Sequence, residues 1–436
     1  MNKTIAVICE YNPFHRGHEY QLMEIRRRFG DCRVVGVMSG AFTERGEPAI
    51  LDKYSRAEAA VRRGCDLVVE LPAPWSMAGA EFFARAGVSL AAAIGADTLA
   101  FGSECGDIGV LRNTAEFLSS EDYKSAIAAA REENPRLQAG ALRNLVLEKN
   151  LGSVPTGSND ILATEYLRAI AFLGVPLDAV TIKREGSDYN STDKRAFASA
   201  TAVRDMLRRG EDPSGFLPKA SAEILKREAD AGRLCTKPLD EAVSAFLRLS
   251  YREMRGKMEV SGGIENRLHE AAKKRRDIEG ILDLALERRY SRSRLRRAIF
   301  GSMLGYTMAD LAEKPLYTSL LAANEVGRGM TAGITIPAIS RPSDYKKLPR
   351  DAREQFERAI RADYLQELCS ENGLEIWKRR CIALDTKKEK APITAIGDLT
   401  TEELNKELGK GMAEVRAGNT IPEEEFLEEL RRDYGL

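Results

Sequence analysis

Histidine is scarce in this sequence: the 436 residues contain only three, at positions 15, 18 and 269. The seven cysteines are odd in number and form no C-x-x-C pair, so we expect neither a zinc site nor a disulfide framework. Unpaired cysteines are typical of a reducing compartment. No signal-peptide pattern opens the chain, and the longest apolar run, near residues 88–94, is far too short to cross a bilayer. We therefore expect a cytoplasmic protein that makes no membrane contact.

An excess of charge of one sign is also absent. Lys and Arg together number 66, and so do Asp and Glu. Any attraction to nucleic acid must therefore come from local patches. Hydrophobic residues make up 43% of the chain, which is enough for a sizeable core, and the length predicts two or three domains.

The first half of the chain alternates short β-branched runs with helical stretches. The runs are nearly continuous in apolar character, which is typical of strands buried on both faces of a parallel sheet. They lie at residues 3–11, 32–39, 65–72, 97–104 and 178–184, and the helical stretches between them at 18–29, 52–64, 80–95 and 159–174. This alternation predicts an α/β domain with a doubly wound parallel sheet, Rossmann-like, over residues 1–210.

Beyond residue 210 strands become scarce and charged helical patterns dominate. We predict a mainly α-helical second domain over residues 211–397, in which residues 329–345 form a short strand or a loop insertion. The last segment, 398–436, holds eleven acidic against five basic residues. It predicts an acidic helical tail.

Two of the three histidines lie in the turn that follows the first predicted strand, in the stretch NPFHRGH. Ligands of doubly wound sheets bind beyond the carboxyl ends of the strands. His18 would stand at the N-terminus of the next helix, where the helix dipole favours an anion, and Gly17 would let the backbone approach a ligand. One histidine could instead cap the helix while the other packs, but the pair together with the glycine favours phosphate chemistry.

A cluster of basic residues in the second predicted domain is the best candidate for contact with RNA. Residues 273–297 hold ten basic residues against four acidic ones, and Tyr290 in the same stretch could stack on a base. This excess is typical of a patch that follows a phosphate backbone, although a solvated helix face has the same composition. The candidate RNA-binding residues are Lys273, Lys274, Arg288, Arg289, Arg292, Arg294, Arg296 and Arg297.

The stretch NPFHRGH resembles the HxGH signature of the nucleotidyltransferase superfamily, whose members split ATP at the α-phosphate. The superfamily's second phosphate motif resembles FASATAVRDML, and that resemblance assigns phosphate contacts to Ser199, Thr201 and Arg204. The chain is more closely similar to the bacterial tRNA(Met) cytidine acetate ligase family. The stretches that carry this similarity are AVICEYNPFHRGHEY, the segment from residue 39 to 72, FGSE, GSNDILATEYL and RYSRSRLRR.

This resemblance implies an AMP-forming ligase that uses ATP and acetate to acetylate N4 of the wobble cytidine of elongator tRNA(Met). Acetyl-adenylate and diphosphate form first, and AMP leaves when the cytosine amine takes the acetyl group, with no requirement for coenzyme A. The implied catalytic residues are His15 and His18. The implied ATP-binding residues are Val7, Ile8, Cys9, Glu10, Tyr11, Asn12, Pro13, Phe14, His15, Arg16, Gly17, His18, Glu19, Tyr20, Gly102, Asn159 and Arg184.

The loop after the second strand carries two further candidates, Arg45 and Lys53, whose cations could neutralise a carboxylate substrate or the polyphosphate. The chain departs from the family pattern here, because Ala41 and Glu44 stand where Asn and Gln are expected. Mg²⁺ is expected with ATP, although no metal ligand is assigned. Two other functions remain open: adenylylation of a small phosphorylated metabolite, and RNA binding without catalysis.

Overall fold

The computed structural model describes residues 2–135, 137, 139–152, 155–184, 199–287 and 290–385, all within one compact unit that ends at Thr386. The predicted tail at 398–436, together with Arg288 and Arg289, lies outside the described residues. The strands are β1 (Thr4–Cys9), β2 (Arg33–Ser39), β3 (Leu67–Leu71), β4 (Thr98–Ser103), β5 (Asp178–Lys183), β6 (Thr318–Ala323), β7 (Ala338–Ile339) and β8 (Ile382–Ala383).

The α-helices alternate with the strands at first and then follow one another. They are α1 (Arg16–Phe29), α2 (Lys53–Arg62), α3 (Ala80–Ala93), α4 (Ile108–Ser119), α5 (Glu121–Glu133), α6 (Ala139–Leu151), α7 (Ser158–Leu173), α8 (Ala200–Arg208), α9 (Lys219–Asp230), α10 (Asp240–Leu249), α11 (Ile264–Lys274), α12 (Ile278–Ala285), α13 (Arg292–Leu304), α14 (Met308–Ala312), α15 (Glu325–Met330) and α16 (Arg350–Glu367). Helices α10 to α13 pack on one another as a group.

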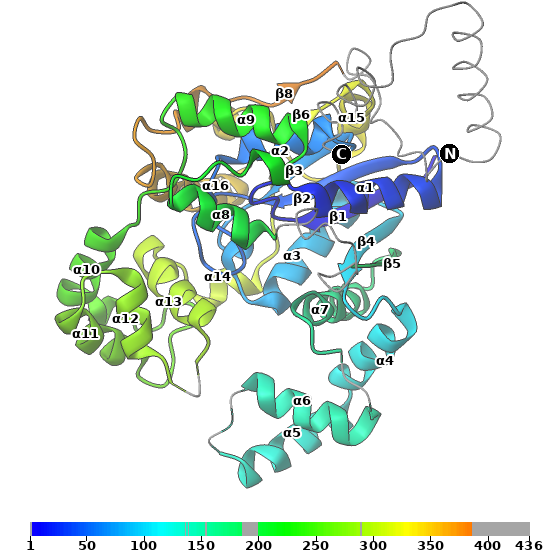
Figure 1. Cartoon of the computed structure of the whole chain (residues 1–436). Helices are drawn as coiled ribbons and strands as arrows, with labels where there is room; N and C mark the ends of the chain where they lie inside the picture. The colour runs from blue at the N-terminus through cyan, green and yellow to red at the C-terminus, as the bar shows by residue number, and fades with distance from the viewer. Residues whose placement is uncertain are drawn as a thin grey trace, which may run out of the picture. The chain divides into compact units, whose positions relative to one another are not determined.

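One mostly parallel sheet organises the described chain, with the strand order β5-β4-β1-β2-β3-β6-β7 and β8 beside β6 (Figure 1). Strands β1 to β5 are parallel to their neighbours, whereas β6 is antiparallel to β3. The chain moves outward from β1 to β3 and then returns to place β4 on the other side of β1. The order therefore reverses between β1 and β4, where ligands of such sheets bind at the carboxyl ends of the strands.

Helices cover both faces of this sheet. On one face α1, α2 and α9 contribute Leu22, Tyr54 and Ile224 to a shared core, and on the other face α3 and α7 contribute Phe83 and Tyr166. Strands β1 to β4 are buried along nearly their whole length as a result. That double burial explains why their sequences are nearly continuous in apolar character.

The predicted fold class is confirmed: a doubly wound α/β arrangement is followed by a mainly helical region. The strand β6 was not predicted, and it joins residues 318–323 to the edge of β3. The domain boundary at residue 210 stays a prediction. The pairing of β3 with β6 joins a strand before that boundary to a strand after it. The short strand β7 falls inside the stretch 329–345.

Within the described part of the chain, none of the helices combines the length and the apolar character that a membrane crossing needs.

Candidate active site

The turn between β1 and α1 is held by three long-range hydrogen bonds. Arg56 Nη1 donates to the Glu10 carbonyl (2.6 Å), and Arg204 Nη1 donates to the Asn12 carbonyl (2.8 Å). The Asn12 side chain accepts from the backbone of Ile50 (2.8 Å). Tyr11 adopts a φ of 45° here, which is uncommon for a bulky residue and typical of a functional turn. These bonds fix where helix α1 begins.

His15 and His18 cap the start of α1 reciprocally. His15 Nδ1 accepts from the Gly17 N–H (3.0 Å), and His18 Nδ1 accepts from the His15 N–H (3.3 Å). An imidazole nitrogen that accepts a hydrogen bond carries no proton, so both neutral rings carry their proton on Nε2. Neither Nε2 has a hydrogen-bond partner among the residues that the structure describes. The two open possibilities for the pair, capping and phosphate binding, are therefore compatible.

The two imidazole rings stack on each other, with centroids 3.7 Å apart, and the Tyr11 ring meets His18 edge-on. Burial, aided by the charges of Arg184 and Arg204, lowers the pKa of His15 to about 4. Burial, His15 and Arg184 likewise lower the pKa of His18 well below its usual value. Both rings are neutral at pH 7 and present N–H donors on Nε2.

A glycine is needed at position 17 because the His15 ring leaves no room for a side chain there, and not because the backbone adopts a conformation that favours glycine. A Cβ atom at this position would lie 2.9 Å from His15 Cε1 and 3.1 Å from Nδ1. The ring of His15 therefore occupies the space that any side chain at position 17 would need. This explains the glycine of the HxGH turn in terms of packing, beside the close ligand approach expected from the sequence.

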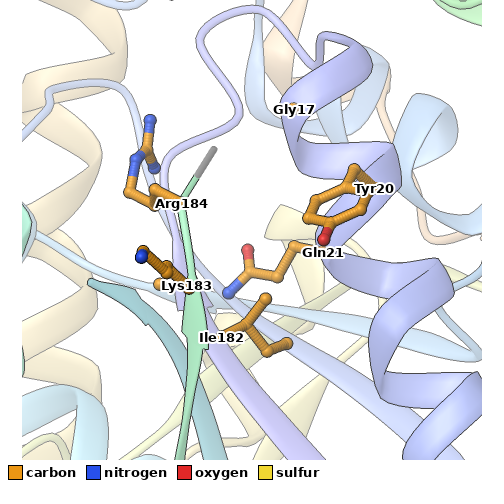
Figure 2. A pocket seen from close by; sticks show the side chains of 7 residues that line it. Gly17, Tyr20, Gln21, Ile182, Lys183 and Arg184 are labelled. Atoms are coloured by element: carbon orange, nitrogen blue, oxygen red, sulfur yellow. The ribbon is translucent and has the colours of Figure 1, made fainter. Parts of the chain in front are cut away.

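A pocket opens beside this turn at the carboxyl ends of β4 and β5. Figure 2 shows Tyr20 and Gln21 of α1 facing Arg184 and its neighbours at the end of β5. Residues that line the pocket are Gly17, Tyr20, Gln21, Gly102, Ile182, Lys183 and Arg184. The structure thus brings together four residues named from the sequence. Gln21, Ile182 and Lys183 were missed, although strand-end position alone could have indicated Lys183.

Gly102 and Asn159 both position Arg184. A Cβ at Gly102 would lie 3.2 Å from Arg184 Cγ, so the glycine gives the arginine stem room to cross β4. Arg184 Nη1 donates to Asn159 Oδ1 (3.5 Å), while Asn159 Nδ2 donates to Glu104 Oε1 (2.6 Å). Glu104 also accepts from the first backbone amides of α7 and so serves as its cap.

Of the segment Val7–Tyr20, only Gly17 and Tyr20 line the pocket. Val7, Tyr11 and Phe14 are buried in the core beneath α1, so a nucleotide could meet only their backbone. Glu19 pairs with Arg63, which follows the last residue of α2, and Arg16 is exposed at the first position of α1. Tyr20 faces the pocket, and the two histidines flank Gly17 in the adjoining turn (Figure 2).

Helix α8 supplies Arg204, which together with Arg184 places positive charge near His15. Ser199 caps the helix by accepting from the Ala202 N–H (3.2 Å), and Thr201 Oγ1 accepts from Arg204 Nη2 (3.2 Å). Arg204 is 8% exposed, and its Nε is buried without a hydrogen-bond partner among the described residues. Burial lowers the pKa of this guanidinium, which nonetheless stays charged. Arg204 also lies 3.7 Å from a Glu47 carboxylate oxygen, so only its Nε is left to donate to a phosphate group beside the two imidazoles.

Comparison with known proteins shows the family of the chain. A family model described as HIGH Nucleotidyl Transferase matches residues 2–379. The tRNA(Met) cytidine acetate ligase of Acetivibrio thermocellus is 33% identical over 85% of this chain and 96% of its own length. That of Syntrophotalea carbinolica is 37% identical over 75% of this chain and 81% of its own. The chain belongs to the tRNA(Met) cytidine acetate ligase family.

A solved structure of a family member supports the same conclusion. The Thermotoga maritima TmcAL bound with alpha-thio ATP has a TM-score of 0.79 and 28% identity, over 87% of this chain and 99% of its own. The apo form of that protein gives a TM-score of 0.80. The predicted resemblance to the acetate ligase family is confirmed.

The loop between β2 and α2 is where this chain departs from the family pattern. Its residue Glu44 contacts both Glu10, before the HxGH turn, and Arg297 of helix α13. Glu44 accepts from Arg297 Nη1 (3.2 Å), and its backbone N–H donates to Glu10 Oε1 (2.7 Å). Burial raises the pKa of both carboxyls. Ala41 is buried, so it offers no polar contact to a substrate.

The two cations named in this loop differ in their surroundings. Arg45 is exposed and makes no hydrogen bond or ion pair within the described ranges, so it remains available to a ligand. Lys53 is only 3% exposed and binds Glu70 (2.7 Å) and Asp363 (2.9 Å). Its ammonium group is already neutralised by two buried carboxylates, which favours a structural role for Lys53.

The basic cluster of helices α11 to α13 is largely paired with acidic side chains. Arg292 binds Glu279 and Asp283, Arg296 binds Glu279 and Glu47, and Arg297 binds Glu259 and Glu44. The sequence showed the arginines but not these partners, most of which come from other segments.

Of the other described cations named here, Lys274 has no ion pair within the described ranges, whereas Lys273 pairs with Glu270 and Arg294 with Glu259. Lys273 and Lys274 are exposed at the end of α11, and Arg294 lies over the Tyr290 ring, 5.2 Å from its centroid. The expectation that Tyr290 could stack on a base is wrong, because its ring is 5% exposed and its hydroxyl donates to the Gly262 carbonyl.

Proposed function

We propose that this protein activates acetate with ATP and transfers the acetyl group to N4 of the wobble cytidine of elongator tRNA(Met). The observation that supports this best is the pair of neutral Nε2–H donors beside Arg184 and Arg204, at the point where the strand order reverses. A triphosphate placed there would meet two hydrogen-bond donors and two cations.

In the first step an acetate oxygen attacks the α-phosphorus, and the bond to the leaving diphosphate breaks. Negative charge that develops on the phosphoryl oxygens would be stabilised by the two Nε2–H donors and by Arg204. The product is acetyl-adenylate, held by the pocket that contains Gly102 and Arg184. In the second step the cytosine amine attacks the acetyl carbon, AMP leaves with the bonding electrons, and the amine gives up one proton.

Mg²⁺ is proposed to accompany the ATP polyphosphate. Among the described residues no group of three or more His, Cys, Asp or Glu side chains could hold a metal ion. The nearest carboxylates are engaged, since Glu10 accepts from a backbone amide and Glu44 and Glu47 bind arginines. No residue is therefore assigned to the metal. Because the substrate is a tRNA and all seven cysteines are unpaired, we propose a cytoplasmic site of action.

The proposed tRNA contact on the second half of the chain rests on Lys274, which has no ion pair within the described ranges, and on Lys273 and Arg294, whose partners Glu270 and Glu259 a phosphate would replace. The experiment that tests the function is incubation with labelled acetate, ATP and total tRNA, followed by nucleoside analysis. We expect label in N4-acetylcytidine without coenzyme A, and diphosphate release that depends on acetate. Turnover driven by a phosphorylated metabolite instead of tRNA, or failure to bind ATP, would contradict the proposal.

A further inference from the structure

A cation-lined cavity lies at the far edge of the sheet, where β7 and β8 meet the turn Pro342–Lys347. Its volume is about 290 Å³, and the Cys381 N–H donates to the Ser340 carbonyl (2.6 Å) to join its two walls. The cavity is lined by Ser340, Arg341, Asp344, Lys347, Arg380 and Cys381. Strand β8 lies beside β6, four strand spacings from β1 along the sheet (Figure 1).

Positive charge in this cavity exceeds the negative charge that faces it. Arg341 Nε and Lys347 Nζ share one oxygen of Asp344, at 3.3 and 2.9 Å. Arg380 is exposed and makes no hydrogen bond or ion pair with any residue of the described ranges. Three cations thus face a single carboxylate, which leaves two positive charges for a ligand. The arginines of α13 differ, because each of Arg292, Arg296 and Arg297 already has two acidic partners.

Exposed aromatic rings adjoin the cavity. Trp377 and Tyr364 are 44% and 43% exposed, and Trp377 Nε1 donates to the Tyr364 hydroxyl (2.8 Å). Behind them Tyr345, from the same turn as Lys347, stacks on Phe356 with centroids 5.1 Å apart and meets Trp377 edge-on. The rings are therefore held in place before any partner arrives, and ordering them costs little on binding.

We propose that this surface, defined by Arg341, Lys347, Arg380, Trp377 and Tyr364, binds RNA. Phosphates enter the cation-lined cavity and an unpaired base stacks on the exposed rings, which is how single-stranded RNA is commonly held. Four strand spacings separate β8 from β1 by about 20 Å across the sheet, so the surface lies at least about that far from the turn that carries His15 and His18. An extended polynucleotide can touch both places at once, whereas a mononucleotide cannot. The identity of the RNA as tRNA rests on the proposed function.

The first test measures tRNA binding by filter retention at several salt concentrations. The variant R341Q/K347Q/R380Q should bind at least about tenfold more weakly at physiological salt, and its salt slope should fall by about two to three. The matched control R112Q/K124Q/K149Q removes three exposed cations from helices α4 to α6. Equal losses in both variants would mean that only net charge matters, and would overturn the proposal.

Two single variants guard against local misfolding. R380E breaks no intramolecular pair within the described chain and should weaken tRNA binding while ATP binding and the unfolding temperature stay unchanged. W377L should lower affinity for tRNA about fivefold or more, through loss of stacking, without changing the salt slope. Unchanged tRNA affinity in both would refute this surface. The function is judged separately, because the wild-type protein must form N4-acetylcytidine whichever surface holds the tRNA.

Discussion

At the residue scale, the absence of a side chain at Gly17 leaves room for the His15 ring, whose Nε2–H is a proposed donor to phosphate. Alanine is the better helix former by about 1 kcal/mol, and Gly17 lies in the first turn of α1. A methyl group there would collide with the His15 ring. We expect Gly17→Ala to leave the unfolding temperature unchanged or slightly raised while turnover falls at least about tenfold. At Gly140 of α6 a methyl group would meet no atom within 4 Å, so Gly140→Ala should stabilise the protein and leave turnover intact. Equal activity of both variants would contradict the positioning role.

The histidines themselves provide the second prediction at this scale. Removing one preorganised donor to a developing oxyanion costs about 10²–10³-fold in rate. His15→Ala and His18→Ala should each lose turnover by that factor, with tRNA affinity unchanged, in steady-state assays of diphosphate release. His18→Gln keeps an N–H donor near the position of Nε2 and should recover part of the loss. Near-normal turnover in both alanine variants would remove the phosphate role.

The lowered pKa of His15 also makes stability depend on pH. The folded ring has a pKa of about 4, whereas the unfolded ring titrates near 6.5. At a pH between these two pKa values, the unfolded chain binds a proton at His15 and the folded chain does not. The free energy of unfolding therefore rises with pH in this range. The contribution is complete above pH 6.5, decreases as pH falls toward 4, and amounts to about 3 kcal/mol for this shift. Chemical denaturation at pH 7.5 and 5 should show a smaller pH dependence for His15→Gln than for the wild type. An unchanged dependence would contradict the buried neutral ring.

At the scale of elements, the sequence predicts what depends on local pattern and misses what depends on distant partners. Strands β1 to β5 follow from continuous apolar runs, and the carboxyl end of β1 led to His15 and His18. Gly102 and Arg184 came from the family resemblance, because a lone glycine or arginine at the end of a strand has no distinguishing pattern. Strand β6 was missed because TSLLAA is short and its identity as a strand depends on pairing with β3, about 250 residues earlier. Gln21 was missed because one polar residue on a charged helix carries no distinguishing pattern.

The contact between the β2–α2 loop and α13 is the element-scale feature with the clearest consequence. Arg297 is 8% exposed and binds both Glu44 and Glu259. Its replacement by Gln leaves two carboxyls without their cation, which should lower the free energy of unfolding by about 2–4 kcal/mol. Arg292→Gln also removes two ion pairs, but their acidic partners are about 60% exposed, so the change should stay below about 1 kcal/mol. Urea denaturation of the two variants compares them directly. Equal effects would show that α13 is not held through this loop.

At the scale of the whole molecule, several buried contacts join the first sixty residues to the segment 360–380. Gln366 donates to the carbonyls of Ala49 and Leu51, and Arg379 binds Asp52. Lys53 binds Asp363 across 310 positions of sequence. Periodicity gives no sign of such pairs, which is why Lys53 was assigned to the substrate. The two ends of the described chain should therefore unfold together.

Lys53 provides the prediction that belongs to this scale. Lys53→Met leaves the buried carboxyls of Glu70 and Asp363 without a cation, and should cost about 3–5 kcal/mol in the free energy of unfolding. Burial already raises the pKa of Asp363 to about 6. Without Lys53 the folded Asp363 carboxyl should bind a proton more tightly than the unfolded one, so the deficit of the variant should shrink as pH falls from 7 to 5. K53M/E70Q/D363N, which removes all three charges, should recover part of the stability at pH 7. Lys378→Met, at an exposed ion pair, should be neutral. A deficit that does not change with pH and persists in the triple variant would mean that packing, rather than the unpaired carboxyls, sets the cost.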